Sequence, residues 1–286
     1  MQLIKTPFAP RAIELDPVEG VAWGQRPSLR LVAGPTYHDI ELVTNITDPS
    51  DIERIEVVNG GDTIVSLSGK SLQIITDHVK VYQEAGRYVL PFGERKARTK
   101  IGMRQSDLVT LQGEVWFVYI TLKVTPTSED ADGNIVDKPT IRARAHVLPS
   151  QEKRYYMPKI NELTWNAAAA GRTPFDYPER SPAINLKRVH FGGNDIARMR
   201  VLRDGYEQLN VIKADNDFDL KQNDLEPMAD QFTLDFISFG FTADGMMNTA
   251  SNETFKFEVE KLSAGAIPLI VERVDQVAPL PEQAQK

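Results

Sequence analysis

A stretch of eleven residues occurs twice in this chain, about half a chain length apart. The first copy begins at Asp51 and reads D-I-E-R-I-E-V-V-N-G-G, and the second begins at Asp195 and reads D-I-A-R-M-R-V-L-R-D-G. Five residues are identical at a constant offset of 144 in a chain of 286 residues. Because an internal echo at half length constrains the whole architecture, we expect one structural unit that is used twice.

The echo continues along the chain without a gap. At the same offset of 144, the apolar residues of a second alternating segment match, namely Tyr88, Leu90 and Phe92 with Phe232, Leu234 and Phe236. Residues that alternate along an extended chain lie on one face of a strand. The matched positions therefore predict a repeated β unit.

Short strand-like segments separated by turn signals dominate both halves of the chain. In the first half they are 28–32, 38–44, 52–58, 63–67, 88–92, 115–124 and 140–147. In the second half they are 183–191, 196–202, 208–212, 232–236, 255–260 and 267–274. Apolar residues at helical spacing predict one helix at 70–84. The pattern indicates an all-β chain with two tandem eight-stranded jelly-roll β-sandwiches, a double jelly roll, and short helices in the loops.

Proline-rich stretches without apolar periodicity divide the chain into parts. We expect an extended N-terminal arm at 1–27, jelly roll 1 at 28–149, a linker at 150–157, jelly roll 2 at 158–276 and a flexible C-terminal tail at 277–286. No apolar run approaches the roughly 20 residues that span a bilayer. The first residues show no signal-peptide pattern.

Composition and motifs exclude several classes of function. Hydrophobic residues make up 41% of the chain, and the formal net charge of −7 gives no overall attraction to nucleic acid. The absence of Cys excludes disulfides, thiolate metal sites and Cys nucleophiles. The four His are scattered, and S-G-K-S at 68–71 lacks the earlier Gly of a phosphate-binding loop. We therefore predict no catalytic residue and no cofactor, with structural calcium as the exception considered below.

The aromatic residues divide into two groups. Segment 115–124 is apolar on both faces, so Trp116, Phe117 and Tyr119 are expected in the core. Trp165 and Tyr177 are expected in a loop of the second unit. The sequence leaves open whether these two anchor that loop by packing or form an exposed contact.

Two acidic segments are candidate calcium sites, because Ca²⁺ takes oxygen ligands. The candidate ligands are Asp130, Asp132 and Asn134 in one segment and Asp215, Asp217 and Asp219 in the other. The second segment has Leu220 where a calcium loop normally has Gly for its sharp turn. A solvated acidic turn is the alternative for both segments.

One loop concentrates positive charge. Its five cations are Arg95, Lys96, Arg98, Lys100 and Arg104. Clustered cations are attracted to anionic lipid head groups, so this loop is a candidate contact with lipid or with acidic neighbours, and a solvated loop is the alternative. Binding to nucleic acid is disfavoured, because the cluster has no interleaved aromatic residues to stack on bases.

The order of short motifs in the second unit resembles a known family. A strand near 189–202 precedes K-A-D-N-D at 213–217, and the strand Q-F-T-L-D-F at 231–236 and a closing strand at 270–274 follow. This order resembles the double jelly-roll major capsid proteins of tailless icosahedral double-stranded DNA viruses, most closely the corticovirus-type bacteriophage capsid proteins. The rest of the chain matches that family by architecture, and it departs from the family in its lack of Cys and its longer N-terminal arm.

That resemblance implies a structural protein of the virion capsid and no enzyme. It implies a homotrimer whose six jelly rolls form a pseudo-hexagonal capsomer, and capsomers that tile an icosahedral shell over an internal lipid membrane. The implied partners are neighbouring capsomers, vertex or minor capsid proteins and the lipids of that membrane, with no specific nucleic-acid partner. Assembly would take place in the host cytoplasm.

Two other functions remain open from the residues alone. A peptide-glycan amidase built on two jelly rolls would need acidic residues that converge between the rolls, and the candidates are Glu56, Asp62 and Glu207. A carbohydrate-binding sandwich protein would expose aromatic residues on a concave sheet face. Most aromatic residues here stand at inward-facing positions, which disfavours the second alternative.

Overall fold

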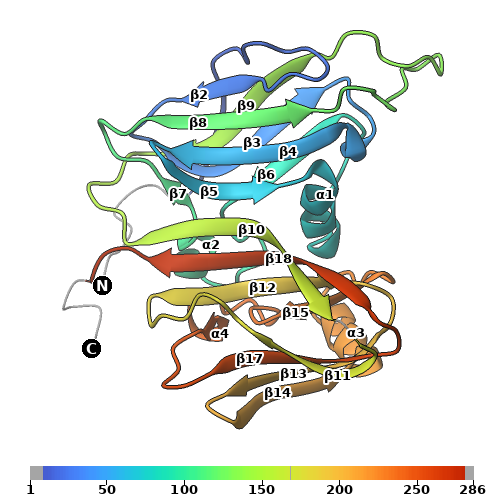
Figure 1. Ribbon diagram of the computed structural model, residues 1–286. Coiled ribbons are helices and arrows are strands. Elements are labelled where there is room, and N and C mark those ends of the chain that lie inside the picture. The colour runs from blue at the N-terminus through green and yellow to red at the C-terminus, as the bar shows by residue number, and fades with distance from the viewer. Residues whose placement is uncertain (1–8, 168, 281–286) are drawn as a thin grey trace.

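The computed structural model describes residues 9–167 and 169–280, which form two β-sandwiches joined edge to edge (Figure 1). One sheet of the first sandwich has the strand order β1 (Arg11–Glu14), β9 (Ile141–Leu148), β3 (Thr36–Thr44) and β6 (Arg87–Pro91), and the short β7 (Leu108–Val109) also pairs with β3. The facing sheet has the order β2 (Ser28–Leu31), β8 (Trp116–Leu122), β4 (Ile52–Asn59) and β5 (Asp62–Leu67).

The second sandwich repeats this arrangement. One sheet has the order β10 (Tyr156–Ala167), β18 (Gly265–Gln276), β12 (Ile184–Gly192) and β15 (Gln231–Asp235), with the short β16 (Met247–Asn248) on β12. The facing sheet has the order β11 (Gly171–Asp176), β17 (Phe255–Lys261), β13 (Ile196–Arg203) and β14 (Tyr206–Ile212). Each strand takes the place of its counterpart in the first sandwich, which confirms the predicted duplication.

The duplication extends to the pairing register. Val57 pairs with Val65 in the hairpin of β4 and β5, and Val201 pairs with Leu209 in the hairpin of β13 and β14. In both hairpins the register shifts directly after this pair, at a β-bulge. Bulges insert one residue and set the register of a strand pair. The echo in the sequence is therefore also an echo in the backbone.

Short helices follow the equivalent hairpins. They are α1 (Gly69–His78) after β5 and α3 (Lys213–Gln222) after β14, with the shorter α2 (Lys100–Arg104), α4 (Thr242–Gly245) and a 3-10 turn (Pro49–Asp51) elsewhere. Within the described residues no helix has the length and apolar character that crossing a membrane requires. The helices are thus accessory elements on a β scaffold.

The helix predicted at 70–84 is correct in its first part and wrong in its last. It ends at His78, and Lys80 then adopts a left-handed φ of 52°. Tyr82 consequently lies outside the helix and is exposed. Residues Lys213–Gln222 form a second helix, α3, which the apolar spacing did not predict.

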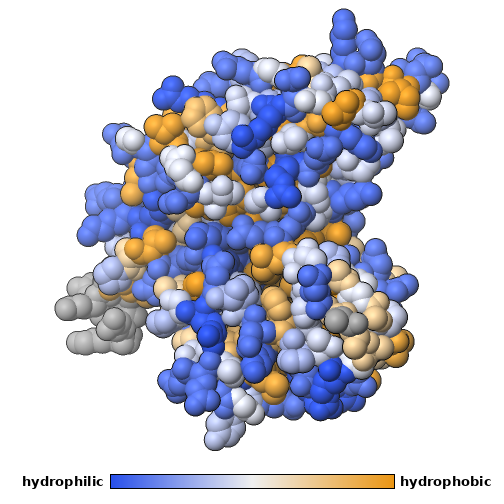
Figure 2. All heavy atoms as spheres, viewed as in Figure 1, coloured by the Kyte–Doolittle hydropathy of each residue, from blue (hydrophilic) through white to orange (hydrophobic). Residues whose placement is uncertain are grey.

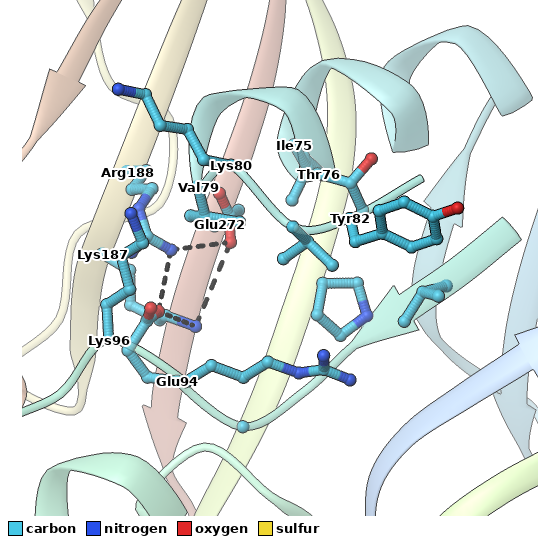
Figure 3. Close-up of a pocket in the computed structure, with 15 residues that line it drawn as sticks. Ile75, Thr76, Val79, Lys80, Tyr82, Glu94, Lys96, Lys187, Arg188 and Glu272 are labelled. Atoms are coloured by element: carbon cyan, nitrogen blue, oxygen red, sulfur yellow. Dashed lines mark hydrogen bonds and ion pairs between the residues drawn. The ribbon is translucent and has the colours of Figure 1, made fainter. Parts of the chain in front are cut away.

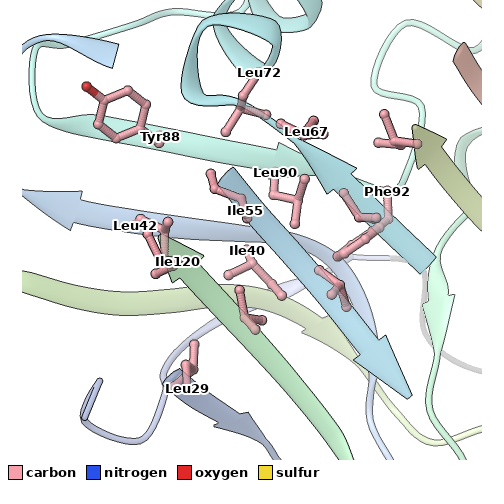
Figure 4. Close-up of a cluster of buried hydrophobic side chains, with 14 of the residues drawn as sticks. Leu29, Ile40, Leu42, Ile55, Leu67, Leu72, Tyr88, Leu90, Phe92 and Ile120 are labelled. Atoms are coloured by element: carbon pink, nitrogen blue, oxygen red, sulfur yellow. The ribbon is translucent and has the colours of Figure 1, made fainter. Parts of the chain in front are cut away.

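The first core lies between the two sheets of the first sandwich (Figure 4). Along β8 the side chains alternate between buried and half-buried, so Trp116 is in this core, whereas Phe117 and Tyr119 lie on the opposite face. There the two rings stack with centroids 5.7 Å apart. The prediction that this segment is buried on both faces, with Phe117 and Tyr119 in the core, is therefore wrong.

The second core is rich in aromatic rings. Phe191, Phe255 and Phe257 are buried at its centre and meet edge to face. Trp165 and Tyr177 belong to the same core, although the sequence placed them in a loop. Trp165 lies on β10 and Tyr177 follows β11 directly. Packing, and not an exposed contact, explains both residues.

Three strands lie in segments that were expected to be irregular. β1 falls in the predicted arm, β10 begins in the predicted linker, and β11 lies in a predicted loop. All four side chains of β1 are exposed, so no hydrophobic alternation marks this strand, and its backbone pairs with β9. The predicted roll limits of 28–149 and 158–276 stay predictions. Residues 1–8 of the arm and 281–286 of the tail lie outside the described residues.

We expect Phe257→Ala to lower the free energy of unfolding by about 3–5 kcal/mol, because it removes a large side chain from the centre of a close-packed core. Phe257 is 1% exposed, whereas Phe218 on α3 is 60% exposed and serves as the matched control. Phe218→Ala should change stability by no more than about 0.5 kcal/mol. Urea titration of both variants measures the difference, and equal unfolding midpoints would contradict the assigned core.

Candidate functional site

The two sandwiches meet where β5 of the first pairs with β10 of the second. The pairing is parallel, with Val65 opposite Ile160 and Ser66 opposite Asn161. It joins one sheet of each sandwich into a nine-stranded sheet that runs through the molecule. An edge strand carries unpaired N–H and C=O groups, so this junction satisfies one edge of each sandwich with the other.

Charged side chains reinforce the strand junction. Arg54 Nη1 donates to Ser66 Oγ at 2.7 Å, and Arg54 Nη2 lies 3.9 Å from Glu162 Oε2 across the junction. Glu162 Oε1 accepts hydrogen bonds from Ser68 N at 2.7 Å and Ser68 Oγ at 2.8 Å. Ser68 is the N-cap of α1. The second sandwich therefore places a carboxylate at the helix N-terminus of the first, where the helix dipole favours negative charge.

Behind the strands lies a buried cluster of charges centred on Arg188. Its Nε lies 2.6 Å from Asp235 Oδ2, and its Nη1 lies 2.8 Å from Glu94 Oε2 and 3.4 Å from Glu272 Oε2. Lys187 Nζ adds contacts to Glu94 at 3.5 Å and Glu272 at 4.0 Å. Glu94 belongs to the first sandwich and the other four to the second. The cluster thus ties the two sandwiches together away from solvent.

Attraction between opposite charges keeps the groups of this cluster ionised. Burial alone would raise the pKa of Asp235, but Arg188 and His78 hold that pKa at about 2. Burial likewise opposes ionisation of Glu272, and Arg188, His190 and Lys187 lower its pKa. Burial acts to lower the pKa of Arg188, yet the three carboxylates raise it. The three pKa shifts all favour the ionised forms of these groups, which are paired with one another.

Two buried histidines complete the cluster. His78 of the first sandwich has Nε2 3.1 Å from Asp235 Oδ2, and His190 of the second has Nε2 3.1 Å from Glu272 Oε1. Their ring centroids are 5.3 Å apart. Burial lowers the pKa of His190. These histidines are packed structural groups at the contact between the two sandwiches, here called the joint. This agrees with their lack of any catalytic spacing in the sequence.

The basic loop bridges the same joint. Arg95 Nη2 lies 2.6 Å from Asp39 Oδ2 in the first sandwich, and Lys96 Nζ lies 2.9 Å from Asp224 Oδ2 in the second. The Arg98 N–H donates to the carbonyl of Gly240 at 2.9 Å. The loop therefore contacts both sandwiches.

The side chains of the other three cations of the basic loop, Arg98, Lys100 and Arg104, differ in their exposure to solvent. The Arg98 guanidinium lies over the Phe241 ring at 5.6 Å from its centroid. Arg104 is buried with Nε 3.6 Å from Asp107 Oδ2, and Lys100 begins α2 with an exposed side chain. The predicted cluster of five cations is spread over a joint, and it does not form one outward-facing patch.

A cavity of about 280 Å³ opens beside the joint (Figure 3). Its apolar wall includes Ile75 and Val79, with Tyr82 nearby, and its charged floor holds Lys187 and Glu272. The charged floor groups pair with one another, as described above. The outer surface narrows to a waist at this level (Figure 2). The cavity is thus a gap between the sandwiches beside the charged cluster.

The carboxylates of the two acidic segments do not converge on a common site. Asp130 Oδ1 accepts the N–H groups of Asp132 and Asn134, each at 2.9 Å, in a tight exposed turn. Asp215, Asp217 and Asp219 lie on α3, where a spacing of two residues turns side chains to different sides. In the part of the chain that the structure describes, no group of three or more His, Cys, Asp or Glu could hold a metal ion. Calcium binding stays a prediction, which thermal unfolding with and without a chelator tests.

The acidic residues of the amidase alternative do not converge. Glu56 lies on β4 of the first sandwich and pairs with Arg26 at 2.7 Å, and Asp62 begins β5 with an exposed side chain. Glu207 lies on β14, the outermost strand of the second sandwich. These residues provide no paired carboxylates for acid–base chemistry.

Sequence reasoning missed the residues of the buried cluster. The signal was in segment 184–192, where Lys187 and Arg188 stand between the apolar residues Leu186 and Val189. Consecutive side chains of a strand point to opposite faces, so two consecutive charges in a strand buried on both faces imply buried partners. Those partners come from distant positions, Glu94 and Glu272, and no local pattern connects them.

We expect Arg188→Met to lower the free energy of unfolding by about 3–5 kcal/mol, because it leaves three buried carboxylates without their shared partner. Arg172 is the control, since it pairs with Glu258 at 3.2 Å but its side chain is 55% exposed. Arg172→Met should cost no more than about 1 kcal/mol. Chemical unfolding of both variants distinguishes them, and a neutral Arg188 variant would contradict the role assigned to the cluster.

We expect acidification to destabilise the joint through His190. Because burial lowers its folded-state pKa below 6.5, the unfolded chain binds a proton that the folded chain does not, and stability falls as the pH drops below about 6.5. The contribution of Asp235 is present above its ordinary pKa and is lost only as the pH falls towards about 2. The thermal midpoint should therefore fall between pH 7 and pH 5, less steeply in His190→Gln. Parallel pH profiles of the two proteins would contradict this.

Comparison with known proteins supports this architecture. The family model described as viral coat protein P2 N-terminal domain matches residues 12–148, and the model described as viral coat protein P2 C-terminal domain matches residues 157–277. No curated protein sequence matches the chain. The two domain models follow the two sandwiches in order.

Solved structures share the fold at low sequence identity. The major capsid protein P2 from bacteriophage PM2 has a TM-score of 0.82 at 18% identity, over 94% of this chain and 98% of that chain. A chain from Sulfolobus Turreted Icosahedral Virus has a TM-score of 0.69 at 11% identity, over 97% and 95%. The PBCV-1 virus capsid has a TM-score of 0.63 at 10% identity, over 97% and 98%.

These matches confirm the predicted double jelly-roll fold and the predicted resemblance. The amidase and carbohydrate-binding alternatives receive no support, since the matched domains are those of a structural coat protein. The two family models together cover nearly all of the described residues. The chain therefore belongs to the viral coat protein P2 family.

Proposed function

We propose that this coat protein assembles as a homotrimer with six jelly rolls, and that these pseudo-hexagonal capsomers tile an icosahedral virion shell. The observation that carries the proposal is the junction of two rolls of identical strand order through β5 and β10. A chain that already contains two similar rolls needs three copies to complete a ring of six. Head-to-tail association forms a closed ring when the rotation between copies closes, and most soluble homo-oligomers have closed symmetry.

Differences between the two rolls support different neighbours in a shell. The connection from β8 to β9 covers residues 123–140 and projects from the first roll, whereas the connection from β17 to β18 covers only 262–264 (Figure 1). The long connection exposes Val124 and Ile135. A loop present on one roll alone lets the two rolls make unlike contacts, so we assign it to neighbouring capsomers or to vertex and minor capsid proteins.

The proposal includes an internal lipid membrane beneath the shell and assembly in the host cytoplasm. Both follow from the family resemblance. Lipid contact by the basic loop stays a prediction, and its paired residues Arg95 and Lys96 make it less favourable than a free cationic patch would be. Flotation with anionic liposomes tests it, since binding that survives neutralisation of these residues would exclude the loop as the lipid contact.

We expect the purified protein to have three times the mass of one 32.1 kDa chain in solution. Sedimentation equilibrium or light scattering measures this mass, and dilution shows whether the trimer is stable. A monomer at all concentrations that nevertheless folds would contradict the trimeric capsomer. Electron micrographs of such trimers should show a six-sided outline.

A further inference from the structure

Among the edge strands of the described residues, β14 and β1 are the counterparts of the two strands that form the internal joint, and neither has a second partner strand there. β14 stands at the outer edge of the second roll, in the place that β5 has in the first (Figure 1). β1 stands at the outer edge of the first roll, in the place that β10 has in the second. The chain therefore carries one junction that is made and the two halves of an equivalent junction that is not.

The registers of the two rolls identify which residues correspond on β1 and β10. Starting from matched leucines of the sequence echo, the directly opposed residues across each sheet are Leu90, Ile40, Ala145 and Ile13 in the first roll and Leu234, Val189, Val271 and Asn161 in the second. Ile13 is thus the counterpart of Asn161, and Ala12 is the counterpart of Ile160.

The other edge follows from the hairpins. Leu209 is the counterpart of Val65, and Asn210 is the counterpart of Ser66, with the same bulge beyond them. In the internal joint, Val65 and Ser66 oppose Ile160 and Asn161. Transferring this register places Leu209 and Asn210 opposite Ala12 and Ile13.

The charged contacts of the internal joint also recur, divided between the open edges. Arg198 corresponds to Arg54, and its Nη1 donates to Asn210 Oδ1 at 3.3 Å, as Arg54 donates to Ser66. Glu14 corresponds to Glu162, and its side chain is 59% exposed. The internal joint brings Arg54 to within 3.9 Å of Glu162. The same two charges are thus present on β13 and β1, where each has a local partner, Glu260 for Arg198 and Arg142 for Glu14.

The helix that follows each hairpin gives independent support for a missing partner at β14. α1 is capped by Ser68, which also donates to Glu162 from the other roll. α3 has Ile212 at the corresponding position, and no side chain caps it. A helix begins with N–H groups that lack intrahelical partners. In the transferred geometry, the carboxylate of Glu14 would accept the N–H of Ile212.

The open edge strands are less buried than β5, as expected for strands that lack a neighbour. Along β5, Val65 and Leu67 are fully buried in the first core. Along β14 no residue is fully buried, and Tyr206 is 76% exposed. β1 is exposed throughout. A soluble protein usually blunts or covers a free edge strand, so a partner is expected for both edges.

We propose that β14 of one copy pairs in parallel with β1 of the next copy, with Leu209 and Asn210 opposite Ala12 and Ile13. Arg198 then meets Glu14 of the next copy. The contact is head to tail, and each copy offers one β14 and one β1, so three copies close a ring with one kind of strand junction repeated between all six rolls. This inference rests on the proposed trimer and specifies the surface that makes it.

Disulfide trapping tests the register, because the native chain has no Cys. Ile13→Cys with Asn210→Cys places the two thiols on opposed residues of different copies. We expect oxidation to yield covalent trimers on a denaturing gel, and each single variant to yield none. In the control, Ile13→Cys with Ile212→Cys, the strand positions are two residues out of register, beyond the roughly 7 Å that a disulfide spans, so trapping should be lost.

The mass of the wild-type protein separates the two possible failures. If the wild type is trimeric and Ile13→Cys with Asn210→Cys does not cross-link, the proposed edge pairing is wrong and the trimer stands. If the wild type is monomeric, the trimer fails and this inference fails with it. Equal cross-linking of the control pair would also overturn the register.

Charge reversal tests the contact between Arg198 and Glu14 without cysteines. Arg198→Glu and Glu14→Arg should each weaken trimer association on the order of tenfold or more, because like charges would face each other across the junction. The double variant restores opposite charges between copies and should recover association. Within one chain, Arg198 also lies 3.6 Å from Glu260 and Glu14 lies 2.7 Å from Arg142. Damage to these local pairs would add up in the double variant, and a double variant weaker than either single one would overturn the contact.

Discussion

The parallel pairing of β5 with β10 is the interaction on which the rest of this structure depends. Sheet edges expose backbone N–H and C=O groups that water or another strand must satisfy. By joining two edges, the chain converts two separate sandwiches into one body with a continuous nine-stranded sheet. The same duplication leaves the corresponding edges of β14 and β1 without a partner strand among the described residues. The two free edges of the chain are therefore different and complementary, and this difference permits head-to-tail assembly.

The buried charges explain how the junction holds a fixed geometry. Two hydrophobic surfaces can slide over each other at little cost, whereas Arg188 reaches Asp235, Glu94 and Glu272 only in one arrangement of the two rolls. Desolvation of so many charges offsets much of their attraction. We therefore infer that the cluster contributes orientation more than net stability. A shell built from repeated junctions needs a constant angle between rolls, and such a cluster supplies it.

The sequence predicted the parts of the fold that carry alternating apolar residues and missed the parts that do not. β4, β6, β13 and β15 were predicted because their buried apolar residues recur at matched positions of the echo. β1 was invisible, since its backbone pairs while its side chains are exposed. α3 was missed because only Asn216 and Leu220 are buried on it. The joint was missed because Glu94 and Glu272 meet Lys187 and Arg188 only through tertiary folding.

Comparison of the two edges shows what duplication preserved and what it changed. The register, the bulge and the Arg and Glu positions are the same, whereas Ile160 of β10, which packs into the first core, corresponds to Ala12 of β1. The internal junction therefore has an apolar anchor that the open edges lack, in addition to the charges that both have. An edge without this anchor gives a weaker contact that depends more on charge complementarity. Weak, directional contacts let a capsomer reject wrong registers before the shell makes them permanent, which a strongly apolar edge would not allow.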